Sequence, residues 1–269
     1  KQPAMAAASF AEQMDSNEGS KAVDNKLAKL LIDVCRSQSV AVFGNVSIAV
    51  LLAAGIAWGY AYTHGQPLLN EAVTAYQFKS IEIFTQPTLW YAAIAGVWLF
   101  CSGIIAGFFD NRSDYLNLRQ RLPFNPFLRK IMRPQPRRRL AAYIHKHYGS
   151  LMGNFIFGML LGMTGYFGHL FGLPLDIRHV AFSSANLGYA AISGHADVFT
   201  FMLGLASVLA IGMVNLVVSF SLALAVALRS RGTRLGSMRN LLKSFWSQVK
   251  ANPLILLYPV QVNNKDNTK

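Results

Sequence analysis

Residues 39–62 read SVAVFGNVSIAVLLAAGIAWGYAY, a run that contains no Lys, Arg, Asp or Glu. A helix needs about 20 predominantly apolar residues to cross the hydrocarbon core of a bilayer. Trp58, Tyr60 and Tyr62 gather at one end of the run, where an interfacial aromatic belt is expected. The run therefore predicts a membrane-spanning helix rather than the core of a soluble domain.

Three further runs of the same kind follow at residues 89–109, 148–173 and 199–228. The whole chain of 269 residues is 53% hydrophobic and 14% charged, whereas soluble domains carry about 25% charged residues. We therefore expect an all-α, polytopic membrane helix bundle with four transmembrane helices. Residues 1–38 then form an N-terminal linker or helix, residues 39–228 the membrane domain, and residues 229–269 a basic tail.

The charges alternate between the segments that connect these runs. Lys and Arg outnumber Asp and Glu by 10 to 2 in residues 110–147 and by 8 to 1 in residues 229–269, but number 1 against 2 in both other loops. Loops rich in Lys and Arg stay in the cytoplasm. The pattern predicts a membrane protein with both termini in the cytoplasm, and it explains the net charge of +13 without DNA.

The spans carry glycines at helical spacing, which lets helices approach closely in lipid. The third and second spans hold the clearest set: Gly158, Gly162, Gly165, Gly172, Gly103 and Gly107. This spacing predicts a tight bundle with the third span near its centre. Such a pattern does not separate packing within the chain from dimerisation, so a homo-oligomer through the glycine-rich faces stays open.

Two shorter segments are predicted to lie at or in the membrane without crossing it. Residues 234–250 place apolar side chains on one helical face and basic ones elsewhere, as in an amphipathic helix on the inner leaflet. A helix that binds a protein partner is the alternative. Residues 180–193 are uncharged but short and polar-rich, which is typical of a re-entrant or interfacial segment.

Polar side chains inside the membrane usually face the protein interior and pair there. The candidate polar cluster is Asn154, His169, Asp176, Arg178, His179, Asn186 and Asn215. These residues either fix helix packing by hydrogen bonds or line a polar substrate path. A third interpretation is that His169, Asp176 and His179 bind a metal ion or relay protons, although Pro174 breaks their common helix face.

A basic patch follows the second span: Arg129, Lys130, Arg133, Arg137, Arg138 and Arg139. We expect anionic inner-leaflet lipids to be its partner, in preference to nucleic acid. The chain has no Walker A motif, no GxGxxG after a strand, no HExxH, no CxxC and no GxSxG. We therefore assign no catalytic residue, no cofactor and no metal.

Residues 122–228 resemble a known family. The resemblance lies in LPFNPFLRKI (122–131), GNFIFGMLLGMTGYFGHLFGLPLDIRHVAFSSANLGYA (153–190) and the segment that begins VNLVVSFSLALAV at residue 214. This region is similar to the C-terminal membrane region of a proteobacterial family named site-specific recombinase, of the gonococcal recombinase-related type. The resemblance implies that this chain, which starts at Lys1, is the C-terminal portion of a longer protein.

The family name implies DNA strand exchange, which requires a defined nucleophile. A tyrosine recombinase needs Arg, His and Arg beside a reactive Tyr, and a serine recombinase needs an activated Ser with several Arg. Arg178 and His179 match such a set only superficially, and the charge pattern places them outside the cytoplasm. The first hypothesis is therefore a non-enzymatic membrane scaffold, sensor or transport component. A recombinase-related protein and a metal- or proton-handling protein are the alternatives.

Overall fold

The computed structural model describes residues 20–230 and 238–256, and all regular structure within them is helical. Four helices are long and apolar enough to cross a membrane. They are α2 (Ser20–His64), α4 (Thr88–Tyr115), α7 (Pro134–Phe171) and α9 (Val198–Ser230). The predicted all-α membrane fold with four long apolar helices is confirmed.

The remaining elements are short. They are α3 (Glu71–Ile81), α5 (Leu118–Arg121), the 3-10 turn η1 (Leu122–Phe124), α6 (Pro126–Ile131), α8 (Val180–Ala191), α10 (Met238–Ala251) and the 3-10 turn η2 (Pro253–Leu256). The segment 180–193 is thus mostly one helix, α8. The amphipathic segment 234–250 corresponds to α10 from Met238 onward, and its first four residues lie outside the described part of the chain.

Two of the long helices begin well before the predicted spans. α2 starts at Ser20 rather than at residue 39, so the described part of the expected linker is helical. α7 starts at Pro134 rather than at residue 148, after Arg133 in extended conformation. Proline suits the first turn of a helix because the missing N–H has no intrahelical acceptor there. Charged residues thus extend both helices beyond the apolar runs.

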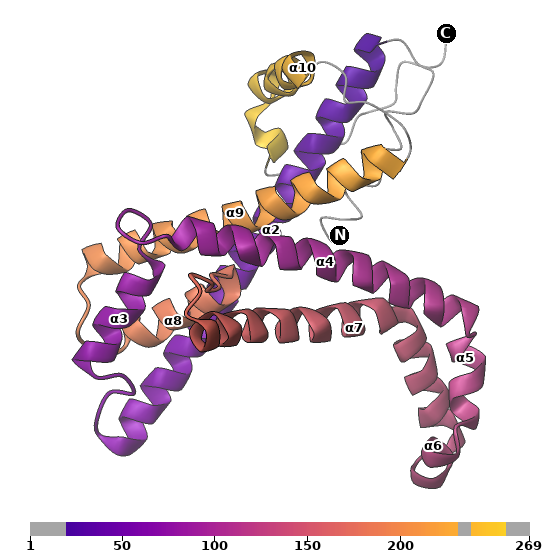
Figure 1. Ribbon diagram of the computed structural model, residues 1–269, viewed down its shortest axis with the longest axis horizontal. Coiled ribbons are helices and arrows are strands. Elements are labelled where there is room, and N and C mark those ends of the chain that lie inside the picture. Colours follow the sequence, from indigo (N-terminus) through magenta and orange to yellow (C-terminus); the bar gives the residue numbers. More distant parts are fainter. Residues whose placement is uncertain (1–19, 231–237, 257–269) are drawn as a thin grey trace.

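The helix at the centre of the arrangement is α4, whereas the third span, α7, lies at its side. α4 packs along α7 on one side and along α9 on the other, and α2 crosses this layer obliquely (Figure 1). The expectation that the third span is central is therefore wrong. α8 packs against both α2 and α9, and it contacts α3 as well.

The main buried cluster lies around α8 and draws on five helices. Its members are Val46, Ile81, Ala92, Val180, Leu187, Val208 and Ile211. A lipid environment gives apolar side chains no hydrophobic reason to leave it, so such contacts hold helices together by close packing. The short helix α8 therefore packs at the middle of this cluster, against α2, α3 and α9.

Glycines make the closest approaches, but the glycines of the predicted stripe on α7 are not among them, whereas Gly96 of the second span does pack, with Val218 2.8 Å from a Cβ built there. A Cβ at Gly149 would strike the backbone carbonyl of Ala106 on α4, and one at Gly153 would lie 2.9 Å from the Ala106 Cβ. A Cβ at Gly188 of α8 would strike the backbone of Val50 on α2. At Gly149 and Gly188 the backbone of the neighbouring helix occupies the space that a Cβ would need, and at Gly153 the Ala106 Cβ lies there.

The predicted glycine stripe of α7 does not pack within the described chain. Apart from the adjoining turns of the same helix, no atom of residues 20–230 or 238–256 lies within 4 Å of a Cβ built at any of Gly158, Gly162, Gly165 or Gly172, and the same holds for Gly107. Gly103 is half-buried. The interpretation of this stripe as an intrachain packing face is wrong, because α4 covers the opposite side of α7.

Candidate functional site

The candidate site is built around the return segment, residues 172–191, which leads from the end of α7 back into the bundle. Gly172 ends α7 with φ 62°, and the N–H of Leu173 donates to the carbonyl of Gly168 at 2.9 Å. This left-handed glycine and its bond form the Schellman motif that closes a helix. The chain then passes close to Gly168, where the carbonyl of Leu175 occupies the space of a Cβ. α8 follows and lies against α2.

Asn215 of α9 joins three parts of the chain at the start of α8. Its Nδ2 donates to the carbonyl of Ala92 on α4 at 2.7 Å and to that of Arg178 at 3.0 Å. Its Oδ1 accepts from the N–H of Val180 at 3.0 Å. The side chain is buried. Because the first N–H groups of a helix have no internal acceptor, Asn215 caps α8 from a different helix.

Arg178 fastens the return segment to α3 and α4. Its Nε donates to the carbonyl of Ser80 at 2.6 Å, and one terminal nitrogen donates to Asp176 Oδ2 at 2.7 Å. The guanidinium carbon lies 5.7 Å from the ring centre of Tyr91, within the range of a cation–π contact. Asp176 and Arg178 thus form an ion pair. The charge of Arg178 is thus neutralised inside the chain.

His179 directly precedes α8 and lies among aromatic rings. Its ring is 5.2 Å from that of Phe157 and 5.9 Å from that of Phe182, centre to centre. Burial disfavours the imidazolium form and lowers the pKa of His179 to about 4. The side chain is therefore neutral at pH 7 and acts as an aromatic packing group.

The predicted metal or proton site is not assembled. In the part of the chain that the structure describes, no three His, Cys, Asp or Glu side chains come together to hold a metal ion. His169 is exposed on α7, Asp176 is bound by Arg178, and His179 packs against phenylalanines. The proline and glycine between His169 and Asp176 turn the chain, which separates these groups.

The polar substrate path is not formed either. It requires one cavity lined by Asn154, His169 and Asn215, but Asn215 is buried in hydrogen bonds while Asn154 and His169 are exposed on α7. Asn186 is half-buried on α8. A cavity of about 350 Å³ does open between α3 and α9. It is lined by Phe78, Lys79, Ile81, Glu82, Thr200, Leu203, Gly204 and Ser207, so it includes none of the predicted residues.

A second polar contact, between α4 and α7, escaped the sequence analysis. Asp110 Oδ1 accepts from the backbone N–H of Gly149 at 2.8 Å, and Ser113 Oγ lies 3.0 Å from His145 Nδ1. Asp114 lies 3.6 Å from the other ring nitrogen of His145. The signal in the sequence was Asp110, the first charge after the second apolar run. Its partner could not be inferred, because it is a backbone group of another helix.

The basic patch lies on an arm formed by α5, α6 and the first turns of α7, which extends away from the rest of the bundle (Figure 1). Arg129 and Lys130 are on α6, Arg133 precedes α7, and residues 137–139 are in its first turns. Arg137 is half-buried and the other five cations are exposed. The arm also exposes Phe124, Phe127 and Ile131.

Fold and site together define a polytopic α-helical membrane protein in which a short internal helix, α8, is capped by a side chain of the long helix α9. The family model described as Site-specific recombinase matches residues 1–259. The chain belongs to this family, and the match extends beyond residues 122–228, where the resemblance was seen in the sequence. No curated protein and no solved structure matches the chain.

Proposed function

We propose that this chain is a non-enzymatic scaffold of the bacterial inner membrane, with both termini in the cytoplasm, that assembles with further copies of itself. The observation that carries the proposal is the division of the polar groups in the spans and the return segment into two sets. Asn215 and Arg178 form hydrogen bonds with backbone groups of other elements and so hold the helices together. Asn154 and His169 face outward from α7.

The outward set shares one face of α7 with the open glycines. Asn154, Gly158, Gly162, Gly165 and His169 follow one another at intervals of three or four residues, and such residues lie on the same side of a helix. Amide and imidazole groups are expensive in contact with lipid, and glycines allow a second helix to come close. A second copy of α7 would cover both features.

Energy transfer between two labelled populations of the full chain in lipid vesicles tests the assembly. Gly158→Ile with Gly162→Ile should reduce the transfer by at least half, because two branched side chains would separate the helices. Gly55→Ile is the matched control: it is also a membrane glycine with open space around it, but it lies on α2. Equal transfer in all three proteins, or transfer no higher than for unrelated monomers, would reject self-assembly.

A flux assay tests the non-transport part of the proposal. Vesicles that contain the chain should hold a proton or potassium gradient as long as empty vesicles do. Protein-dependent flux that Asn215→Ala changes would instead establish a transport component.

Family membership favours a second candidate, a role in handling DNA. The arm offers the chemistry for phosphate contacts, with Arg129, Lys130 and Arg133 exposed beside one another. Binding of labelled duplex DNA should then weaken with salt, with log K falling by about 0.9 per phosphate contact for each unit of log salt. Replacing these three residues by Gln should remove about three such contacts, and protein that ignores DNA at low salt would reject this candidate.

A further inference from the structure

α10 has two different faces, and only one of them is used within the described chain. Leu241 and Val249 are buried, and Leu241 packs with Leu27 and Ala28 of α2. Ser244 Oγ donates to Asn25 Oδ1 at 2.6 Å, and Gln248 donates to the Asn25 carbonyl at 3.1 Å. The face predicted to lie on the membrane is therefore largely occupied by α2.

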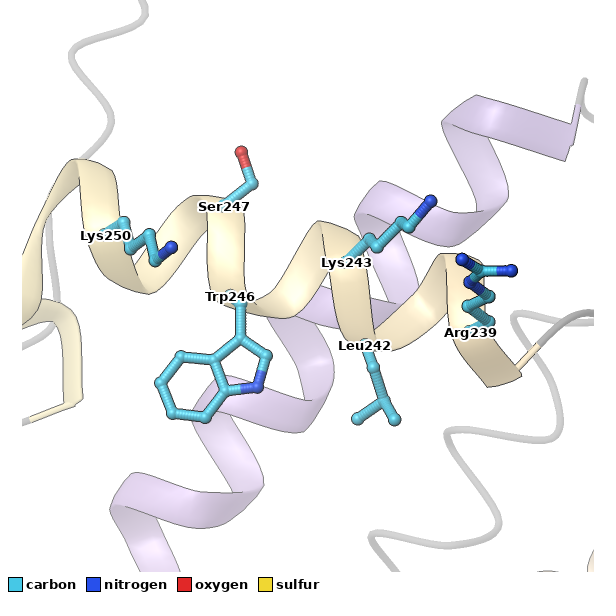
Figure 2. A pocket seen from close by; sticks show the side chains of 6 residues that line it. All are labelled: Arg239, Leu242, Lys243, Trp246, Ser247 and Lys250. Atoms are coloured by element: carbon cyan, nitrogen blue, oxygen red, sulfur yellow. The ribbon is translucent and has the colours of Figure 1, made fainter.

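The other face presents cations around an exposed apolar pair. Arg239, Leu242, Lys243, Trp246, Ser247 and Lys250 line an open hollow on it (Figure 2). Leu242 is 44% and Trp246 is 57% exposed. In Figure 2 Leu242 and Trp246 point toward one edge of this face, whereas Lys243 and Ser247 point toward its other edge. α10 contains no acidic residue.

The buried side of α10 joins this helix to two of the long apolar helices. Its buried side is packed against Leu27 to Leu31 of α2 and against Leu224 of α9. Leu224 lies one helical turn before Leu228, the last residue of the fourth apolar run. α10 is thus held against two long apolar helices, ahead of the apolar run of α2 and near the end of that of α9.

We propose that the outer face of α10 docks on an anionic lipid leaflet, with Trp246 and Leu242 inserted below the headgroups and Arg239, Lys243 and Lys250 bound to lipid phosphates. Tryptophan prefers the membrane interface because its ring is apolar and its N–H is polar. A basic helix of this kind buries its apolar side chains at the boundary between headgroups and acyl chains. α10 then acts as a clamp, holding α2 with one face and the leaflet with the other. This proposal does not depend on the proposed scaffold function.

Trp246 itself reports the docking. The full chain contains four tryptophans, and replacement of Trp58, Trp90 and Trp98 by Phe leaves Trp246 as the only strong emitter. In lipid nanodiscs that contain about one-third phosphatidylglycerol, its emission should be blue-shifted and quenched by lipids brominated near the headgroup. In discs of phosphatidylcholine alone the quenching should be weaker, because each basic residue near an anionic surface strengthens association about five-fold.

Arg239→Gln, Lys243→Gln and Lys250→Gln together should lower the ratio of docked to undocked α10 roughly 100-fold and abolish the quenching. Lys79→Gln removes an exposed cation of α3 and should leave the signal unchanged. Water-like, unquenched emission of Trp246 in anionic discs would overturn the proposal. So would quenching that survives the triple substitution, or emission that responds to duplex DNA but not to anionic lipid.

Discussion

Replacing Asn215 by Ala should release α8 from the bundle without disturbing the contact between α4 and α7. The substitution removes three hydrogen bonds: one from the Val180 N–H, one to the Ala92 carbonyl and one to the Arg178 carbonyl. Side-chain hydrogen bonds in membrane proteins contribute about 0.6 kcal/mol on average and up to about 1.7 kcal/mol. Three of them, at a buried helix start that His179 does not cap with its own side chain, amount to roughly 2–5 kcal/mol.

Thermal unfolding in detergent and hydrogen exchange measure the two consequences of this change. A loss of 1 kcal/mol lowers Tm by roughly 2–4 °C in chains of this size, so Asn215→Ala should lower Tm by about 4–20 °C. Amide exchange should accelerate in the return segment, residues 172–191, and stay slow where α4 contacts α7. Asn154→Ala is the control, because Asn154 is also a membrane asparagine but is exposed on α7.

Two results would refute the reasoning. If Asn215→Ala and Asn154→Ala unfold at the same temperature, the hydrogen bonds of Asn215 contribute nothing that the exposed asparagine does not. If exchange accelerates equally in all four long helices, Asn215 supports the whole bundle and not α8 in particular.

Three further predictions concern other parts of the molecule. Because burial lowers the pKa of His179 to about 4, the unfolded chain binds a proton that the folded chain does not, between about pH 6.5 and pH 4. The free energy of unfolding should therefore be constant above about pH 6.5 and should decrease as the pH is lowered from about 6.5 to about 4. His179→Phe should remove that dependence in acid unfolding curves. Gly188→Val should drive α8 away from the α2 backbone and lower the free energy of unfolding by about 3 kcal/mol or more. Gly55→Val is the control, because its side chain would point into open space; it should change Tm by about 2 °C or less. Gly149→Ala should separate α4 from α7 at the Ala106 carbonyl, which a cysteine cross-linking series between the two helices would detect as a changed pattern; an unchanged pattern would contradict the close approach.

The sequence predicts the four long helices well because the signals are local. Length, lack of charge and flanking aromatic residues all lie within the run that becomes the helix. Pro87 also marks the start of α4 at the next residue. The true helix ends differ where charged residues continue the helix, as before residue 39 in α2, because a hydropathy pattern shows only the apolar part.

The packing of the helices depends on partners distant in the chain, so the sequence predicts it poorly. Spacing correctly shows that Gly158 and Gly162 share a face of α7, but it does not show that α4 covers the other face. Gly153 packs on Ala106 and Gly188 packs on Val50, and the latter pair is separated by more than 130 positions. Asn215 was selected as a polar residue in a span, and its bonding to the return segment became visible only in three dimensions.

The state of Arg178 bears directly on the family name. Strand exchange would need a guanidinium free to hold a DNA phosphate, yet Nε and one terminal nitrogen of Arg178 donate to the chain itself, and Asp176 balances its charge. A phosphate would have to displace Asp176 and detach the return segment from α3. A phosphate that binds the exposed cations of the arm would not have to displace an internal partner of this kind within the described chain. DNA binding, if the family name describes this chain, is therefore expected at the arm, and Arg178→Gln should change stability while leaving any DNA affinity intact.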